Sequence, residues 1–184
     1  KSQAEKRAFS YFVIPRFTHA RASEGNSIQD LYAAIIKNGN RNVLLVEDAI
    51  NLVRAGRSPI LLTERKEHAA QLAMLLKPQV QNVFLMVGSD KPKEKREKLD
   101  ALHATPANEE VVVVATGKYI GEGFDAPRLD TLLLAMPISW KGTLAQYAGR
   151  LHRNYEGKHE VRIYDYVDIR IPMLERMYHK RLKG

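Results

Sequence analysis

Short, unbroken apolar runs separated by amphipathic segments are the feature that most constrains how this chain can fold. Val111–Val114 and Leu132–Leu134 contain only aliphatic side chains. Runs of this length are typical of parallel strands that are buried on both faces of a sheet. The pattern therefore predicts central strands that are covered by other elements on both sides.

Strands and helices are predicted to alternate from residue 59 onward. Strands are expected over residues 59–63, 82–87, 111–115, 129–136 and 161–167, and helices over 64–76, 93–103, 142–152 and 172–182. Such alternation implies crossover connections between parallel strands. We therefore expect an α/β fold, with a mostly parallel central sheet and helices on both faces.

A different segment precedes this alternation. Residues 8–17 are aromatic and apolar enough for a strand, and Pro15 favours either a position at the edge of a sheet or the end of a strand. Helices are predicted over residues 28–37, with Ser27 as the N-cap, and over 41–55. We expect residues 1–56 to be an N-terminal strand and helical segment packed on the same domain as residues 57–184. The chain begins at Lys1 without a methionine, so we also expect it to be a piece of a larger protein.

Composition narrows the classes of function. The 184 residues include 29 Lys and Arg against 21 Asp and Glu, a net charge of +8, which suits a polyanionic partner or simply a solvated basic surface. Cysteine is absent, which excludes disulfides and thiolate metal sites, and the six histidines are not grouped at metal-ligand spacing. No apolar run approaches about 18 residues, so we expect a cytoplasmic protein without a membrane span.

Two clusters of special residues follow the apolar runs. In the helix predicted after Met136, Gln146, Arg150 and Arg153 share one face, and two arginines one turn apart suit phosphate oxygens. They could equally be surface arginines that pair with acids. In the earlier cluster, Gly123 permits unusual backbone angles, and Asp125 could accept a hydrogen bond from a ribose hydroxyl or form a local turn before a proline.

These clusters resemble motifs of one family. Ala115-Thr116-Gly117 and Gly121-Glu122-Gly123-Phe124-Asp125-Ala126-Pro127 resemble motif V of the second, C-terminal RecA-like domain of superfamily 2 helicases, and Gln146-x-x-Gly149-Arg150-x-x-Arg153 resembles motif VI. The predicted strand and helix over residues 59–76 look like motif IV, and Gly88 falls on a looser match. The resemblance covers about residues 57–167 and implies a RecA-like fold related to P-loop NTPases.

The resemblance implies roles for particular residues. Arg150 and Arg153, with Gln146 on the same face, would act on the γ-phosphate of ATP, Arg153 being the expected arginine finger. Asp125, with the backbone around Gly123, would meet the nucleotide edge. Thr63, Gly88, Thr116 and Gly117 would contact the phosphate backbone of a nucleic acid.

Departures from the family pattern refine the expectation. Glu122 stands where DEAD-box proteins carry arginine, and the motif V loop is one residue longer, so the chain is more similar to restriction-type and repair-type helicases. We therefore favour DNA over RNA as the partner.

The sequence lacks a GxxxxGK[ST] phosphate loop and a buried-strand Asp-Glu pair. ATP with Mg²⁺ would then be held mainly by an N-terminal RecA-like domain of the same polypeptide. The leading hypothesis is the second motor domain of an ATP-dependent helicase or translocase, inactive as an isolated fragment. The alternatives are a noncatalytic nucleic-acid-binding module with the same fold and a stand-alone nucleotide-binding enzyme, the latter disfavoured by the missing glycine-rich loop.

Overall fold

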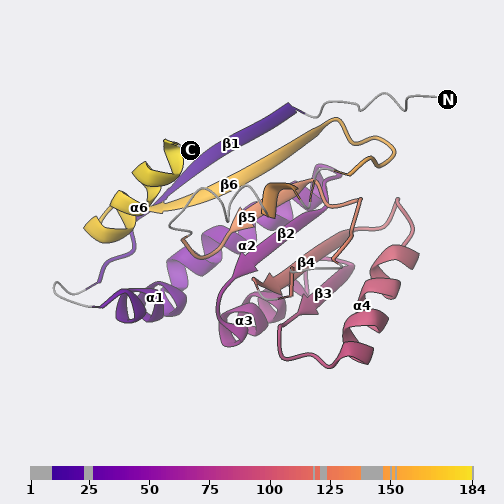
Figure 1. Ribbon diagram of the computed structural model, residues 1–184, viewed down its shortest axis with the longest axis horizontal. Coiled ribbons are helices and arrows are strands. Elements are labelled where there is room, and N and C mark those ends of the chain that lie inside the picture. Colours follow the sequence, from indigo (N-terminus) through magenta and orange to yellow (C-terminus); the bar gives the residue numbers. More distant parts are fainter. Residues whose placement is uncertain are drawn as a thin grey trace.

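One parallel sheet organises the chain (Figure 1). The computed structural model describes residues 10–22, 27–117, 119–120, 124–137, 147–149, 151 and 153–183. Its strands are β1 (Ser10–Thr18), β2 (Pro59–Thr63), β3 (Asn82–Met86), β4 (Val111–Thr116), β5 (Thr131–Leu134) and β6 (Glu160–Asp168). Its helices are α1 (Ile28–Lys37), α2 (Gly39–Arg54), α3 (Lys66–Leu76), α4 (Pro92–Ala104) and α6 (Pro172–Leu182).

The six strands lie in the order β1-β6-β5-β2-β4-β3, and every neighbouring pair is parallel. All residues of β2, β4 and β5 are buried. The predicted α/β fold, with a parallel sheet whose central strands are covered on both sides, is therefore confirmed.

Alternate side chains of the central strands pack into two different hydrophobic cores, one on each face of the sheet. Val112 and Val114 pack with α2 and α3 on one face, whereas Val111 and Val113 pack with Leu102 of α4 and the segment that follows β4 on the other. This period of two is what a pleated strand imposes. A third cluster joins α1 and α6 beyond the carboxyl ends of β1, β5 and β6, where Figure 1 shows the two helices at the same end of the sheet.

The N-terminal strand completes the same sheet. β1 pairs with β6 alone among the described strands and is an edge strand, as Pro15 predicted, with Pro15 in register with Asp165. Helix α1 begins where Ser27 caps it, and the Ser27 side chain accepts a hydrogen bond from the Asp30 amide. The domain division at residue 57 stays a prediction.

Helix α2 carries more than packing residues. Arg41, with its side chain fully buried, pairs with Asp168 at the end of β6 and donates to the Ala135 carbonyl oxygen beyond β5. Asp168 also accepts from the Thr18 hydroxyl of β1. A buried pair of this kind costs about 3–5 kcal/mol when one partner is removed. Helix α2 therefore fastens the carboxyl ends of three strands.

Candidate functional site

The four residues predicted to contact nucleic acid come together at the carboxyl ends of β2, β3 and β4. Thr63 and Thr116 end adjacent strands and are in register. The Gly88 amide donates to the Thr116 hydroxyl oxygen at 2.8 Å, and the Gly117 amide donates to the Thr63 carbonyl oxygen at 3.1 Å. A hollow of about 410 Å³ lies over this edge, lined by Glu64, Arg65, Lys66, Glu67, Gly88, Ser89, Thr116 and Gly117.

Most donors of the four residues are already used inside the protein. Thr63 is 1% exposed, and its hydroxyl lies 2.8 Å from His68 Nδ1. The amides of Gly88 and Gly117 have the internal acceptors just described. Thr116 accepts from Gly88, so its hydroxyl hydrogen is left to point elsewhere. Of the four, Gly88, Thr116 and Gly117 line the hollow, and Thr63 contributes position rather than contact.

His68 fixes the direction of the Thr63 hydroxyl. The His68 Nε2 atom lies 2.9 Å from the Oδ1 atom of Asn42. The side-chain amide nitrogen of Asn42 donates to the Ile36 carbonyl oxygen, which identifies the other amide atom as the oxygen. Since an amide oxygen only accepts, Nε2 carries the hydrogen and Nδ1 accepts from Thr63. Burial, and next the nearby Arg41, lower the pKa of His68 to about 3, so the ring is neutral.

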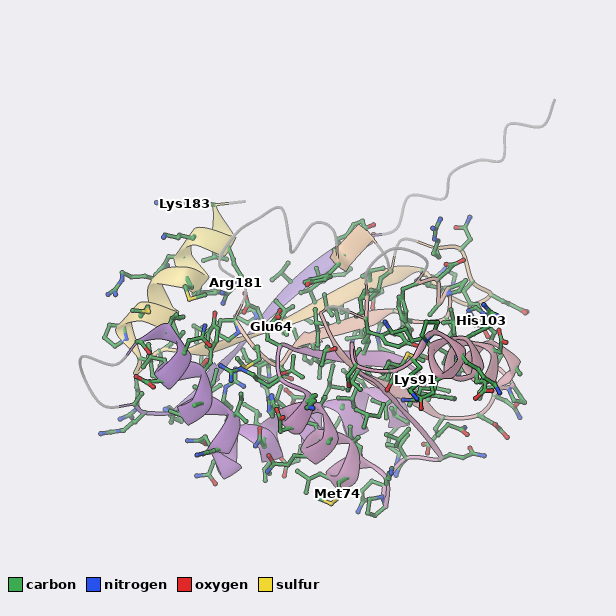
Figure 2. The ribbon with its side chains drawn as sticks, turned by 60° about the horizontal axis from the view of Figure 1, so that its bottom comes forward. Glu64, Met74, Lys91, His103, Arg181 and Lys183 are labelled. Carbon is green, nitrogen blue, oxygen red and sulfur yellow. The ribbon has the colours of Figure 1, made fainter. Side chains whose placement is uncertain are left out.

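Charged residues at the start of α3 surround the hollow and were not singled out from the sequence. Lys66 and Glu67 are exposed, and so is Glu64, which precedes α3 and is labelled in Figure 2. Arg65 is the N-cap residue and makes no side-chain cap hydrogen bond. The first amides of a helix have no acceptor within the helix. Such amides attract anions. A strand followed by Thr-Glu-Arg-Lys was the signal that could have identified them.

Gly117 lines the hollow and also lies close to Tyr147. Residues 147–149 are helical, and a methyl group on Gly117 would lie 2.8 Å from the Tyr147 hydroxyl and 3.1 Å from Glu64 Oε1. Burial, followed by the Glu64 charge, raises the pKa of Tyr147. A larger residue at position 117 would therefore require the ends of the Tyr147 or Glu64 side chains to shift.

The predicted nucleotide contacts lie elsewhere, on segments that lead into β5 and β6. Arg153 Nε is 3.3 Å from Asp125 Oδ1, and both side chains are about half exposed, at 53% and 54%. The Asp125 carbonyl oxygen is 2.5 Å from His103 Nε2 at the end of α4, which is labelled in Figure 2. Gly123, Gln146 and Arg150 lie outside the described residues, as does most of the helix predicted over 142–152.

The part of the chain that the structure describes contains no group of three His, Asp or Glu side chains positioned to hold a metal ion. No helix in that part is long and apolar enough to cross a membrane.

No family model and no curated protein sequence matches the chain. Solved structures do match. UvsW of T4 matches with a TM-score of 0.75 and 18% identity, over 94% of this chain and 38% of that one. The C-terminal part of the Fun30 ATPase domain matches with a TM-score of 0.66 and 14% identity, over 80% of this chain and 47% of that one. The E. coli DEAD-box protein SrmB, bound to the regulator of ribonuclease activity A, matches with a TM-score of 0.60 and 16% identity over 94% of this chain and 82% of that one.

The chain thus spans well under half of the UvsW structure and about half of the Fun30 structure. Because the matches include a DEAD-box protein, they do not confirm a greater similarity to restriction-type and repair-type helicases. At the level of fold, the expectation is confirmed: the chain has a RecA-like α/β fold with a six-stranded parallel sheet, similar to the folds of these solved structures.

Proposed function

We propose that this chain is the second motor domain of an ATP-dependent nucleic-acid helicase or translocase. The observation that carries the proposal is the pairing of Arg153 with Asp125, which brings the resembled motifs VI and V into contact. Both side chains are exposed, and a surface ion pair contributes only about 0–1 kcal/mol to stability. Either residue can therefore leave its partner and bind a ligand instead.

The residues here suit one side of a shared ATP site. ATP supplies the phosphoryl group, and Mg²⁺ and the phosphates would be held mainly by an N-terminal RecA-like domain, since this chain lacks a phosphate loop. Arg153 would present a permanent positive charge to the γ-phosphate and stabilise the charge that develops there. The resemblance alone supports the same ATP site for three further residues, Arg150, Gln146 and Gly123.

The hollow at the carboxyl ends of β2, β3 and β4 is proposed to follow the backbone of a DNA strand. Thr116 offers its hydroxyl, and Arg65, Lys66 and Ser89 add donors that line the same hollow. The amides at the start of α3 add partial positive charge. Contacts of these kinds position a phosphate backbone without reading sequence.

Steady-state ATP hydrolysis by the intact protein tests the proposal. Arg153→Ala is expected to reduce the DNA-stimulated rate by about 10³-fold or more, because that is the scale of an arginine finger. DNA affinity should remain within about twofold. Arg170→Ala, at another exposed arginine, is the matched control. An unchanged rate in Arg153→Ala would refute the finger assignment.

The isolated 184-residue chain is expected to show negligible hydrolysis, because the phosphate-holding half of the site is missing from its sequence. Robust turnover by this chain alone would overturn the shared site. An intact protein that binds DNA but hydrolyses no ATP would favour the alternative, a noncatalytic binding module.

A further inference from the structure

Lys158 is a buried lysine whose ammonium group bonds to two different loops. It lies in the turn before β6, next to Gly157 with a φ of +78°, and is 6% exposed. Its Nζ atom donates to the Pro127 carbonyl oxygen at 3.0 Å and to the Leu151 carbonyl oxygen at 2.5 Å. One side chain therefore links the segment after β4 to the segment that follows residues 147–149.

Both linked segments carry a predicted nucleotide contact. The Leu151 carbonyl oxygen also accepts from the Arg153 amide at 2.8 Å, so Lys158 and the Arg153 backbone share one acceptor. Pro127 lies two residues after Asp125, whose carboxylate pairs with the Arg153 side chain. The contacts form a closed ring from Lys158 through Leu151, Arg153 and Asp125 to Pro127.

The charged form of Lys158 is disfavoured by burial. The pKa of Lys158 is lowered to about 8. Burial is the largest cause and lowers the pKa, the charge of Asp130 raises it, and the charge of Arg57 lowers it. Burying an ammonium group costs free energy unless strong acceptors surround it. Carbonyl oxygens of the two loops serve as such acceptors, which ties the loops to the charge.

We propose that Lys158 is a positioning residue for Arg153. Its ammonium group fixes two carbonyl oxygens, and through them it holds the Arg153 backbone and the loop that carries Asp125 in place. The inference rests on the proposed function, in which Arg153 is the arginine finger. A finger acts on a transition state, and displacement by about 1 Å can cost about 10²-fold in rate. Lys158 touches neither nucleotide nor nucleic acid in this account and acts through Arg153.

A double-mutant cycle of Lys158→Met and Arg153→Ala tests the inference. The measurement is kcat and KM for ATP hydrolysis by the intact protein at saturating DNA. Lys98→Met is the matched control, since Lys98 also donates to a carbonyl oxygen, that of Leu85 at 2.7 Å, beside edge strand β3. Thermal unfolding of each variant records the loss of stability separately.

Lys158→Met is expected to lower kcat by about tenfold or more and to change KM by less than about threefold, because a misplaced finger affects the transition state. In the Arg153→Ala background the same substitution should cost less than about twofold, since the finger through which it acts is already absent. Lys98→Met should leave kcat near that of the wild-type protein.

A Lys158→Met loss that persists in full in the Arg153→Ala background, or an unchanged kcat, overturns the inference and leaves the proposed function standing. An Arg153→Ala variant with normal kcat overturns both. If Lys158→Met does not fold, Lys158→Gln replaces it, because glutamine keeps N–H donors without the charge, and the same two criteria decide.

Discussion

Arg153 Nε lies 3.3 Å from Asp125 Oδ1, and this contact joins the two sequence clusters that resemble motifs V and VI. Both side chains are about half exposed, so water screens the pair and its contribution to stability is small. A pair that is weak and accessible is suited to exchange for a ligand rather than to holding the fold. The two partners can therefore be separated experimentally by their effects on substrate.

Asp125→Asn in the intact protein should raise KM for ATP and change kcat by less than about threefold. A carboxylate that meets a ribose hydroxyl contributes to ground-state and transition-state binding alike, so its loss appears in KM. Asp100→Asn, at an exposed acid of α4, is the control in the same steady-state assay. A fall in kcat with normal KM would contradict the role at the nucleotide edge.

Gly117→Ala should lower the thermal stability of the chain, by about 1–3 kcal/mol if the surroundings cannot move, because the added methyl overpacks the site. The methyl would lie 2.8 Å from the Tyr147 hydroxyl. Tyr147→Phe in the same chain should restore part of the loss by removing that oxygen. Gly39→Ala, where nothing lies within 4 Å, is the control in the same denaturation experiment. Equal effects of the two glycine substitutions would refute the close approach.

His68 should make the chain lose stability as the pH falls below about 6.5. Its pKa is lowered from 6.5 to about 3, so the unfolded chain binds a proton in this window and the folded chain does not. The free energy of unfolding should therefore be fully retained above pH 6.5 and fall by up to about 1.4 kcal/mol per pH unit below it.

Chemical denaturation between about pH 4.5 and 7.5 measures this slope. His68→Gln should flatten it, whereas His179→Gln, at an exposed histidine of α6, should not. Identical slopes in the wild-type chain and His68→Gln would show that His68 does not stay neutral when folded.

Arg41→Met should cost about 3–5 kcal/mol of folding free energy, because it leaves the Asp168 carboxylate buried without its cation. The side chains of Arg41 and Asp168 are both 0% exposed. Lys93→Met at the exposed Lys93–Glu97 pair, with a separation of 3.9 Å, should cost less than about 0.5 kcal/mol in the same denaturant titration. A small effect of Arg41→Met would mean that Asp168 finds water or another partner.

The sheet could be predicted from the sequence because its signals are local. Apolar runs identified β4 and β5, and Pro15 favoured the edge position that β1 has. The strand predicted over residues 129–136 was too long, since β5 covers only Thr131–Leu134. Apolar composition alone cannot mark where ladder pairing stops.

The buried polar contacts could not be predicted in the same way. Arg41 meets Asp168, and His68 meets Asn42, only after the chain folds, and no periodic pattern records which distant residue will be the partner. For the same reason, Thr63 could be placed at a strand end, but the inward direction of its hydroxyl could not be foreseen. The roles of Gly123, Gln146 and Arg150 stay predictions.

Arg153 is proposed to stabilise a transition state in an ATP site shared with another domain. Single-turnover hydrolysis by the intact protein, with saturating DNA, measures the chemical step without product release. The account predicts that Arg153→Ala slows this step by about 10³-fold or more and changes the Kd for ATP by less than about threefold. A chemical step of wild-type rate in Arg153→Ala would contradict it.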